Sequence, residues 1–189
     1  MIRTRFLFVV TLWLVATAGW AHPQPQVVRA DDVESVPFPG HALKVLARAA
    51  DTPGGASIQE LIVPPRSFGA PPHVHSREDE HFYVLEGEVQ FLDREQTLSA
   101  RAGTLVVLPR GHLHGFWNAS DAPARLLLVI TPGDFTEFFD AVVARIRAEN
   151  PESPGAVGKL IGQEATKHGV TIHPDKVPAS AKAFLPGAK

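Results

Sequence analysis

Three histidines and one glutamate are spaced so that four metal-ligating side chains could meet at one point. His73 and His75 are two residues apart, so both imidazoles point to the same face of a β-strand. Glu80 follows after a gap long enough for a turn, and His114 lies in a separate stretch. Imidazole nitrogen and carboxylate oxygen suit iron, manganese, nickel, cobalt, copper and zinc alike. The residues therefore predict one divalent transition metal per chain and leave its identity open.

Short β-branched and apolar runs, separated by glycine and proline, surround these residues. We expect strands at residues 43–49, 58–63, 88–92, 97–100, 104–108 and 126–130. Many short strands at close spacing indicate an all-β sandwich or barrel. The apolar side chains that we expect to line a pocket over the metal, or else to fill the barrel core, are Phe82, Val84, Phe91, Leu105, Val107 and Phe116.

The pattern becomes helical after the last of these strands. Large apolar residues recur at helical spacing over residues 135–148, with Asp134 as the expected N-cap and Glu137 completing a capping pattern. A second helix is expected over residues 156–168, closed by Gly169. The last residues of the chain, rich in proline, alanine and lysine, are expected to fray.

The beginning of the chain is typical of export. Arg3 and Arg5 precede an apolar run that is too short to span a bilayer comfortably, and small residues follow it. We expect a signal peptide at residues 1–21, a leader at 22–39, a barrel at 40–133, and a helical extension with a tail at 134–189. The mature protein would be periplasmic or secreted and not membrane-bound.

Composition excludes several partners and ligands. The formal net charge is −2 and becomes −4 once residues 1–21 and their two arginines are removed, with no basic stripe, so nucleic acid is not an expected partner. The chain has no cysteine, which excludes disulfides and thiolate metal ligands. A homodimer through an exposed edge strand stays open.

Two stretches resemble the paired motifs of the cupin superfamily. The second motif, G-x5-P-x-G-x2-H-x3-N, fits at Gly103, Pro109, Gly111, His114 and Asn118. The first, G-x5-H-x-H-x3,4-E-x6-G, fits at His73, His75, Glu80 and Gly87 but opens with three residues between Gly69 and His73 in place of five.

This resemblance implies a double-stranded β-helix, the cupin or jelly-roll barrel, with one or two C-terminal helices. It also selects Glu80, rather than Asp79, as the carboxylate ligand, because Glu80 keeps the six-residue gap to Gly87.

Residues 42–139 are similar to single-domain cupins described as quercetin 2,3-dioxygenase-like. The likeness implies oxidative cleavage of a flavonol-like, enolic or phenolic small molecule by dioxygen, with Glu80 as the catalytic base. Two alternatives remain because the fold carries many chemistries. One is a metal-dependent lyase or isomerase, and the other is a non-catalytic protein that binds a metal or a small molecule.

Overall fold

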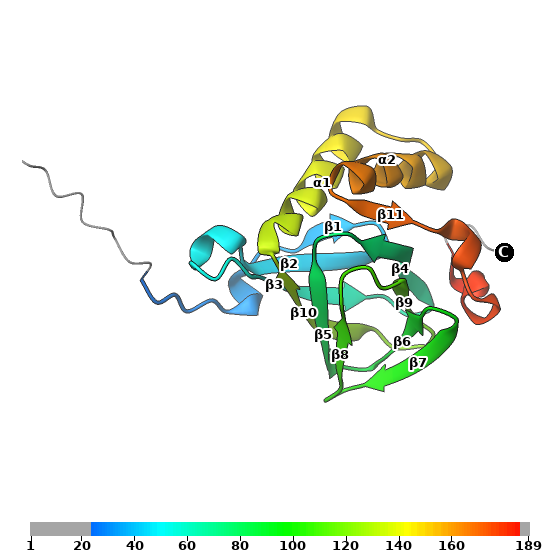
Figure 1. Cartoon of the computed structure of the whole chain (residues 1–189), viewed down its shortest axis with the longest axis horizontal. Helices are drawn as coiled ribbons and strands as arrows, with labels where there is room; N and C mark the ends of the chain where they lie inside the picture. The colour runs from blue at the N-terminus through cyan, green and yellow to red at the C-terminus, as the bar shows by residue number, and fades with distance from the viewer. Residues whose placement is uncertain (1–23, 186–189) are drawn as a thin grey trace, which may run out of the picture.

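The computed structural model describes residues 24–185, in which two antiparallel sheets face each other and two helices lie across one end (Figure 1). The six-stranded sheet has the order β1 (Val36–Phe38), β2 (His41–Ala47), β3 (Ser57–Val63), β10 (Ala124–Thr131), β5 (Asp79–Glu86) and β8 (Leu105–Leu108). The five-stranded sheet has the order β11 (Val170–Ile172), β4 (Ser67–His75), β9 (His114–Asn118), β6 (Glu88–Asp93) and β7 (Gln96–Arg101).

Alternation of side chains along the strands makes the core between the sheets. In β10, the central strand of the larger sheet, Leu126, Leu128 and Ile130 are at most 2% exposed, and the residues between them are more exposed. Leu126 pairs with Leu61 of β3 and Val84 of β5, and Leu128 pairs with Gln59 of β3 and Phe82 of β5. The predicted all-β class, a double-stranded β-helix with C-terminal helices, is confirmed.

Gly87 is the corner at which the chain leaves one sheet for the other. β5 belongs to the six-stranded sheet and β6 to the five-stranded sheet, with only Gly87 between them. Residues other than glycine rarely adopt its φ of +75°. A Cβ at this position would lie 3.0 Å from the carbonyl oxygen of Pro123. The interruption expected at Gly87 therefore carries β6 to the opposite sheet.

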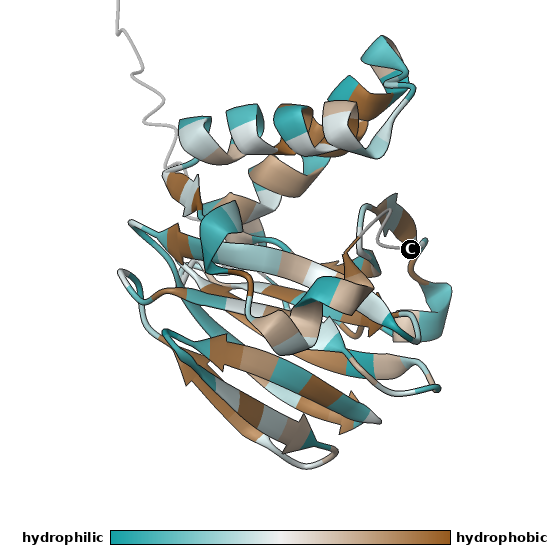
Figure 2. Cartoon of the chain, turned by 90° about the vertical axis from the view of Figure 1, so that its right-hand side faces the viewer, coloured by the Kyte–Doolittle hydropathy of each residue, from teal (hydrophilic) through white to brown (hydrophobic). Residues whose placement is uncertain are grey.

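The two helices are α1 (Thr136–Glu149) and α2 (Pro154–Lys167), which lie over the end of the barrel (Figure 2). The expected Asp134 cap is wrong, because a 3-10 turn, η3 (Gly133–Phe135), precedes α1, and Phe135 at the N-cap makes no side-chain capping bond. α2 begins at a cap that the sequence analysis missed, where Ser153 accepts a hydrogen bond from the Ala156 amide at 3.2 Å. Gly169 follows α2 with φ +79°, as expected.

The chain after α2 returns to the barrel. β11 pairs with β4, and the 3-10 turns η4 (Pro174–Lys176) and η5 (Ala179–Phe184) follow it. Ala181 is fully buried in a small cluster with Phe68, Leu92 and Trp117. The last residues, which were expected to fray, are therefore fixed up to Leu185 by strand pairing and apolar burial, and residues 186–189 lie outside the described residues.

Near the N-terminus, the expected leader contributes η1 (Ala30–Asp32) and strand β1, and η2 (Ala49–Asp51) follows β2. The signal peptide predicted at residues 1–21 lies outside the described residues. Within residues 24–185, no helix is long and apolar enough to cross a membrane.

Candidate metal centre and its cavity

The four predicted ligands come from both sheets. His73 and His75 lie at the end of β4, and His114, the first residue of β9, pairs directly with His73 across the five-stranded sheet. Glu80 lies on β5 of the opposite sheet, where its inward neighbours are Phe82 and Val84. The three imidazoles therefore face the carboxylate across the interior of the barrel.

The ligand atoms converge closely. His73 Nε2 and His75 Nε2 are 3.1 Å apart, and Glu80 Oε2 lies 3.0 Å from His114 Nε2 and 3.7 Å from His75 Nε2. One ligand atom from each of the four residues lies within 4.8 Å of every other. The tertiary structure thus brings together side chains that lie up to 41 positions apart in the sequence.

Each imidazole is held by its other ring nitrogen. Nδ1 of His73 is 2.7 Å from the carbonyl oxygen of Pro71, and Nδ1 of His114 is 2.9 Å from that of His112. Nδ1 of His75 lies 3.2 Å from the carboxylate of Glu78. Because carbonyl and carboxylate oxygens accept, each Nδ1 carries the proton when the ring is neutral, and the Nε2 lone pairs point at the common centre.

Burial and mutual charge set the ionisation of this cluster. Burial, reinforced by His114 and His75, lowers the pKa of His73 well below its usual range. Burial alone would keep Glu80 protonated, but His75, His114 and His73 outweigh it and lower the pKa of Glu80 to about 2. Burial also opposes a charge on His75, yet Glu80 and Glu78 together raise the pKa of this residue. At neutral pH the centre therefore contains an ionised Glu80 and a neutral His73.

The donor set fits a divalent transition metal. Ligand atoms ~2.1 Å from one ion lie ~3.0 Å apart as neighbours and ~4.2 Å apart as opposites in a regular site. The observed separations of 3.0, 3.1 and 3.7 Å fall within this range. Four protein ligands would leave one or two positions open on a five- or six-coordinate ion, as a catalytic site requires.

The other acidic residues of the run have different roles. Asp79 forms an ion pair with Arg110 at 2.7 Å and points away from the cluster. Glu78, which the sequence analysis gave no specific role, is 5% exposed and bonds to the ring of His75. Its spacing of three residues from His75 was a usable indication, but three consecutive acids do not reveal which one turns inward.

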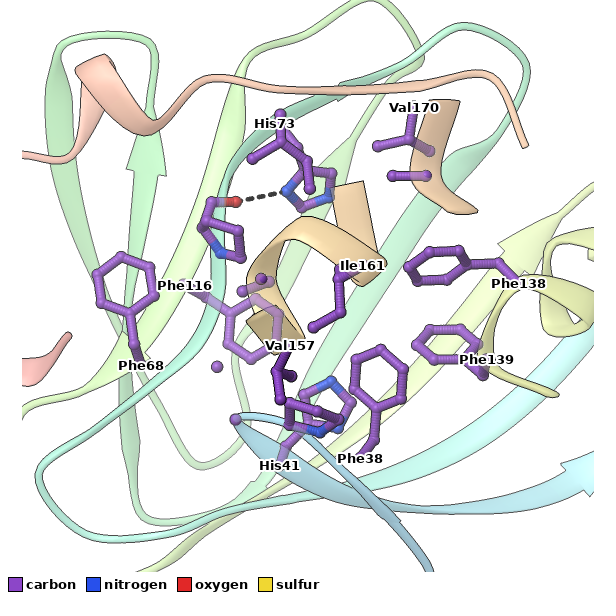
Figure 3. Close-up of a pocket in the computed structure, with 18 of the residues that line it drawn as sticks. Phe38, His41, Phe68, His73, Phe116, Phe138, Phe139, Val157, Ile161 and Val170 are labelled. Carbon is purple, nitrogen blue, oxygen red and sulfur yellow. Dashed lines mark hydrogen bonds between the residues drawn. The ribbon is translucent and has the colours of Figure 1, made fainter. Parts of the chain in front are cut away.

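A cavity of about 800 Å³ opens beside the cluster, and its walls come from both sheets and both helices. His73, His75 and Glu80 lie in its lining, as do Phe82 and Phe116 among the predicted pocket residues. The aromatic side chains of η3 and α1 close another side: Phe135 meets the ring of His75 edge-on at 4.6 Å and stacks on Phe138 at 4.9 Å. Residues of α2 and β11, including Val157, Ile161 and Val170, complete the wall (Figure 3).

Four of the six predicted pocket residues lie elsewhere. Val84 and Phe91 are fully buried in the core and do not line the cavity. Leu105 and Val107 are 56% and 52% exposed. They pair with Tyr83 and His81 on the outer face of the sheet, whereas Val106 and Leu108 pair with inward-facing residues of β5. An apolar run of four residues does not reveal which alternate set faces inward, and a shift by one residue exchanges the faces.

The cavity contains one polar residue that the sequence analysis left without a function. His41, the first residue of β2, is 6% exposed and lines the cavity between aromatic rings. Its ring stacks on Phe38 at 5.2 Å and on Phe116 at 6.1 Å. Nothing near His41 in the sequence suggests a site, because its neighbours in the cavity come from β1, β9 and α1.

Comparisons with known proteins agree with this geometry. Residues 59–130 match the Cupin_2 family, described as a cupin domain. The match covers less than half of the chain and agrees with the two facing sheets of the double-stranded β-helix.

The chain is similar to plant germin-like proteins. Germin-like protein subfamily T member 2 of Arabidopsis thaliana is 35% identical over 95 residues, which are 46% of this chain and 41% of that protein. Germin-like protein 5-1 of Oryza sativa subsp. japonica is 28% identical over 162 residues, which are 82% of this chain and 65% of that protein. The chain thus covers less than two thirds of either relative.

Solved structures share the fold at low sequence identity. A predicted oxalate decarboxylase from Thermotoga maritima superposes with a TM-score of 0.53 at 23% identity over 56% of this chain and 97% of that one. A sugar phosphate isomerase of the cupin superfamily from Silicibacter pomeroyi gives a TM-score of 0.50 at 24% identity over 56% of this chain and 75% of that one. At these identities the likeness extends to the fold alone.

Proposed function

We propose that the protein is an exported metal-dependent cupin dioxygenase that cleaves a flavonol-like, enolic or phenolic small molecule. The observation that carries this proposal is the position of the cluster. Three Nε2 atoms and one carboxylate converge at one end of a cavity whose remaining wall is almost entirely apolar. A centre that combines metal ligands with an apolar aromatic wall suits a flat substrate with one ligating oxygen.

The four ligands would hold one divalent transition metal. Such an ion, when bound, supplies Lewis-acid activation of a substrate hydroxyl and a meeting place for dioxygen. Dioxygen is the proposed co-substrate, and both of its oxygen atoms would enter the products. The fit rests on the donor types and on the orientation of all three imidazoles by Nδ1 bonds.

The chain's own residues would bind and deprotonate the substrate. Glu80 is ionised at neutral pH because its pKa is lowered to about 2, and its carboxylate is the group of the cluster that could accept the proton of a substrate hydroxyl. Because a lowered pKa makes Glu80 a weak base, this transfer would require the bound ion to acidify the hydroxyl as well. Phe82 and Phe116 flank the site on the barrel side, and Phe135 and Phe138 do so on the helix side. These rings would orient a planar substrate and exclude water from the reacting atoms.

The test is aerobic incubation of metal-loaded protein with flavonols, followed by substrate absorbance and oxygen uptake. We expect turnover that needs both metal and oxygen and that is lost in Glu80→Gln but retained in Asp79→Asn. Substrate loss that continues without oxygen would favour a lyase or isomerase. No turnover with iron, manganese, nickel, cobalt or copper would contradict catalysis and leave a binding protein.

Export rests on the N-terminal sequence alone. Arg3, Arg5 and the apolar run that follows have the order of a signal peptide. We expect the mature protein, isolated from the extracellular or periplasmic fraction, to begin at His22 when its N-terminus is sequenced. Retention of Met1 in the purified protein would contradict this.

A further inference from the structure

His41 occupies a fixed position at the wall of the cavity, away from the cluster of four ligand side chains. It follows the two-residue turn Pro39–Gly40 between β1 and β2 and pairs with Phe38 across that turn. Gly40 has φ +98°, and a Cβ there would lie 2.6 Å from the carbonyl oxygen of Gly69, so the turn packs directly on β4. The backbone therefore holds the imidazole rigidly against the barrel.

The polar ring of His41 lies among apolar aromatic side chains. Three aromatic rings pack around the imidazole, those of Phe38, Phe116 and Phe139. Its Nδ1 is buried against the protein, where only the backbone of Ala42 lies near it and no hydrogen bond of ordinary geometry forms in the described part of the chain. A ligand in the cavity would therefore meet the other ring nitrogen, Nε2. A buried polar group without a partner costs about 1–3 kcal/mol, a cost that phenylalanine at this position would avoid.

The imidazole is neutral when the protein is at physiological pH. Burial lowers the pKa of His41 to about 4, and the backbone of Ala42 and the charge of Glu80 offset only part of this effect. A neutral imidazole donates a hydrogen bond from one nitrogen and accepts one at the other. His41 could therefore bind a hydroxyl or a carbonyl group without introducing a charge.

The arrangement of polar groups in the cavity defines the ligand that would satisfy them. The polar side chains in its lining are the cluster residues His73, His75 and Glu80, then His41, and finally Glu152 and Ser153, which are exposed at the rim. Figure 3 shows His73 and His41 on opposite sides of the hollow, with Phe116 on one flank and Phe138 and Phe139 on the other. A matching ligand has an apolar body and two separated polar groups.

We propose that His41 is a second anchor of the cavity, which hydrogen-bonds one oxygen of an aromatic ligand whose other oxygen lies at the metal cluster. The ligand class is thus a planar aromatic compound with two separated oxygen functions. This inference rests on the proposed function only in requiring that the cluster hold a metal. It adds a positioning residue and a substrate feature that the metal chemistry by itself does not require.

The test measures binding and not turnover. The full mature protein, loaded with zinc so that no redox chemistry occurs, is titrated by calorimetry with 2-naphthol, 2,6-dihydroxynaphthalene and 2,7-dihydroxynaphthalene. We expect the second hydroxyl of at least one diol to tighten binding to the wild type by roughly tenfold relative to 2-naphthol. In His41→Phe that gain should fall below roughly twofold, while the affinity for 2-naphthol stays the same.

Two further variants separate a hydrogen bond from a change in packing. His41→Gln keeps a donor and an acceptor and should restore part of the gain. Tyr83→Phe serves as the control, because it removes a polar group that is 41% exposed on the outer face of the sheet and does not line the cavity, and it should keep the wild-type preference for the diol.

The inference is overturned if the second hydroxyl gives an equal gain in wild type and His41→Phe, if it gives no gain in the wild type, or if no probe binds. It fails independently of the proposed function. Flavonol turnover that does not depend on His41 would contradict only the role proposed for His41. Diol selectivity without turnover would contradict only the proposed dioxygenase activity.

Discussion

The two ends of the cavity differ in how their side chains are fixed. At the cluster, each imidazole is oriented by a hydrogen bond from Nδ1, and each ligand lies on a strand or at its end. At the end covered by α1 and α2, apolar side chains such as Phe138, Val157 and Ile161 pack without directional bonds. The difference indicates that the strands determine the chemistry and that the helices determine which molecule reaches it.

Removing the metal-ligating side chain of Glu80 should have the largest effect on metal affinity. We expect Glu80→Ala to lower metal affinity by more than roughly 100-fold, because the four-ligand set becomes three and the neighbouring imidazoles lose their only carboxylate partner in the cluster. Metal analysis after dialysis against a weak chelator measures this. Asp79→Ala is the matched control and should keep about one metal per chain, since Asp79 pairs with Arg110 outside the cluster. Equal metal loss in the two variants would contradict the assignment of Glu80.

Removing the charge of Glu78, which orients the ring of His75, should have the second-largest effect on metal affinity. Glu78→Gln removes the charge that holds Nδ1 of His75, and loss of such an outer partner typically costs 10–100-fold in metal affinity. Competition with a metal indicator measures the change. Glu88→Gln, at an exposed carboxylate that accepts hydrogen bonds from Gln90 and Ser99, should have no effect on affinity. Full metal affinity in Glu78→Gln would show that strand geometry alone orients His75.

The dependence of stability on acid pH should report the burial of His41. Because its folded-state pKa of about 4 lies below the usual 6.5, the unfolded chain takes up a proton first as pH falls, and stability is lost between these values. Above pH 6.5 this contribution is absent. His41→Phe should therefore gain about 2 kcal/mol relative to wild type between pH 7 and pH 5.

Urea unfolding of metal-free protein at the two pH values measures this gain, and His41→Gln should show the same change. A stability difference between His41→Phe and wild type that does not vary with pH would show that the imidazole titrates normally in the folded protein.

The smallest effect is expected from a substitution in α2, which should weaken ligand binding only moderately. Ile161→Ala removes apolar atoms from the cavity wall and should weaken binding of an aromatic ligand by roughly three- to tenfold, at ~0.8 kcal/mol per buried methylene. Metal affinity should not change, because Ile161 contributes no ligand. Calorimetry with 2-naphthol and the indicator assay measure the two quantities separately. A fall in metal affinity would show that the two ends are coupled.

The sequence by itself determined the parts of this protein that depend on short spacing. His73 and His75 share a face because strand side chains alternate, and Gly87 marks a corner because it must adopt a positive φ. The six strands predicted from apolar runs and both helices agree with the structure to within a few residues at their ends, whereas β1 and β11 were not predicted. These features are local, so neighbouring residues are enough to specify them.

Only the tertiary structure decided which faces turned inward and which distant segments met. Leu105 and Val107 face outward because pairing with β5 sets their register, and a short apolar run carries no mark of that register. His41 entered the cavity because β1, β9 and α1 pack around it, and β11 joined β4 through contacts across about 100 residues of sequence. Such contacts depend on how the whole chain closes, which no single stretch of it encodes.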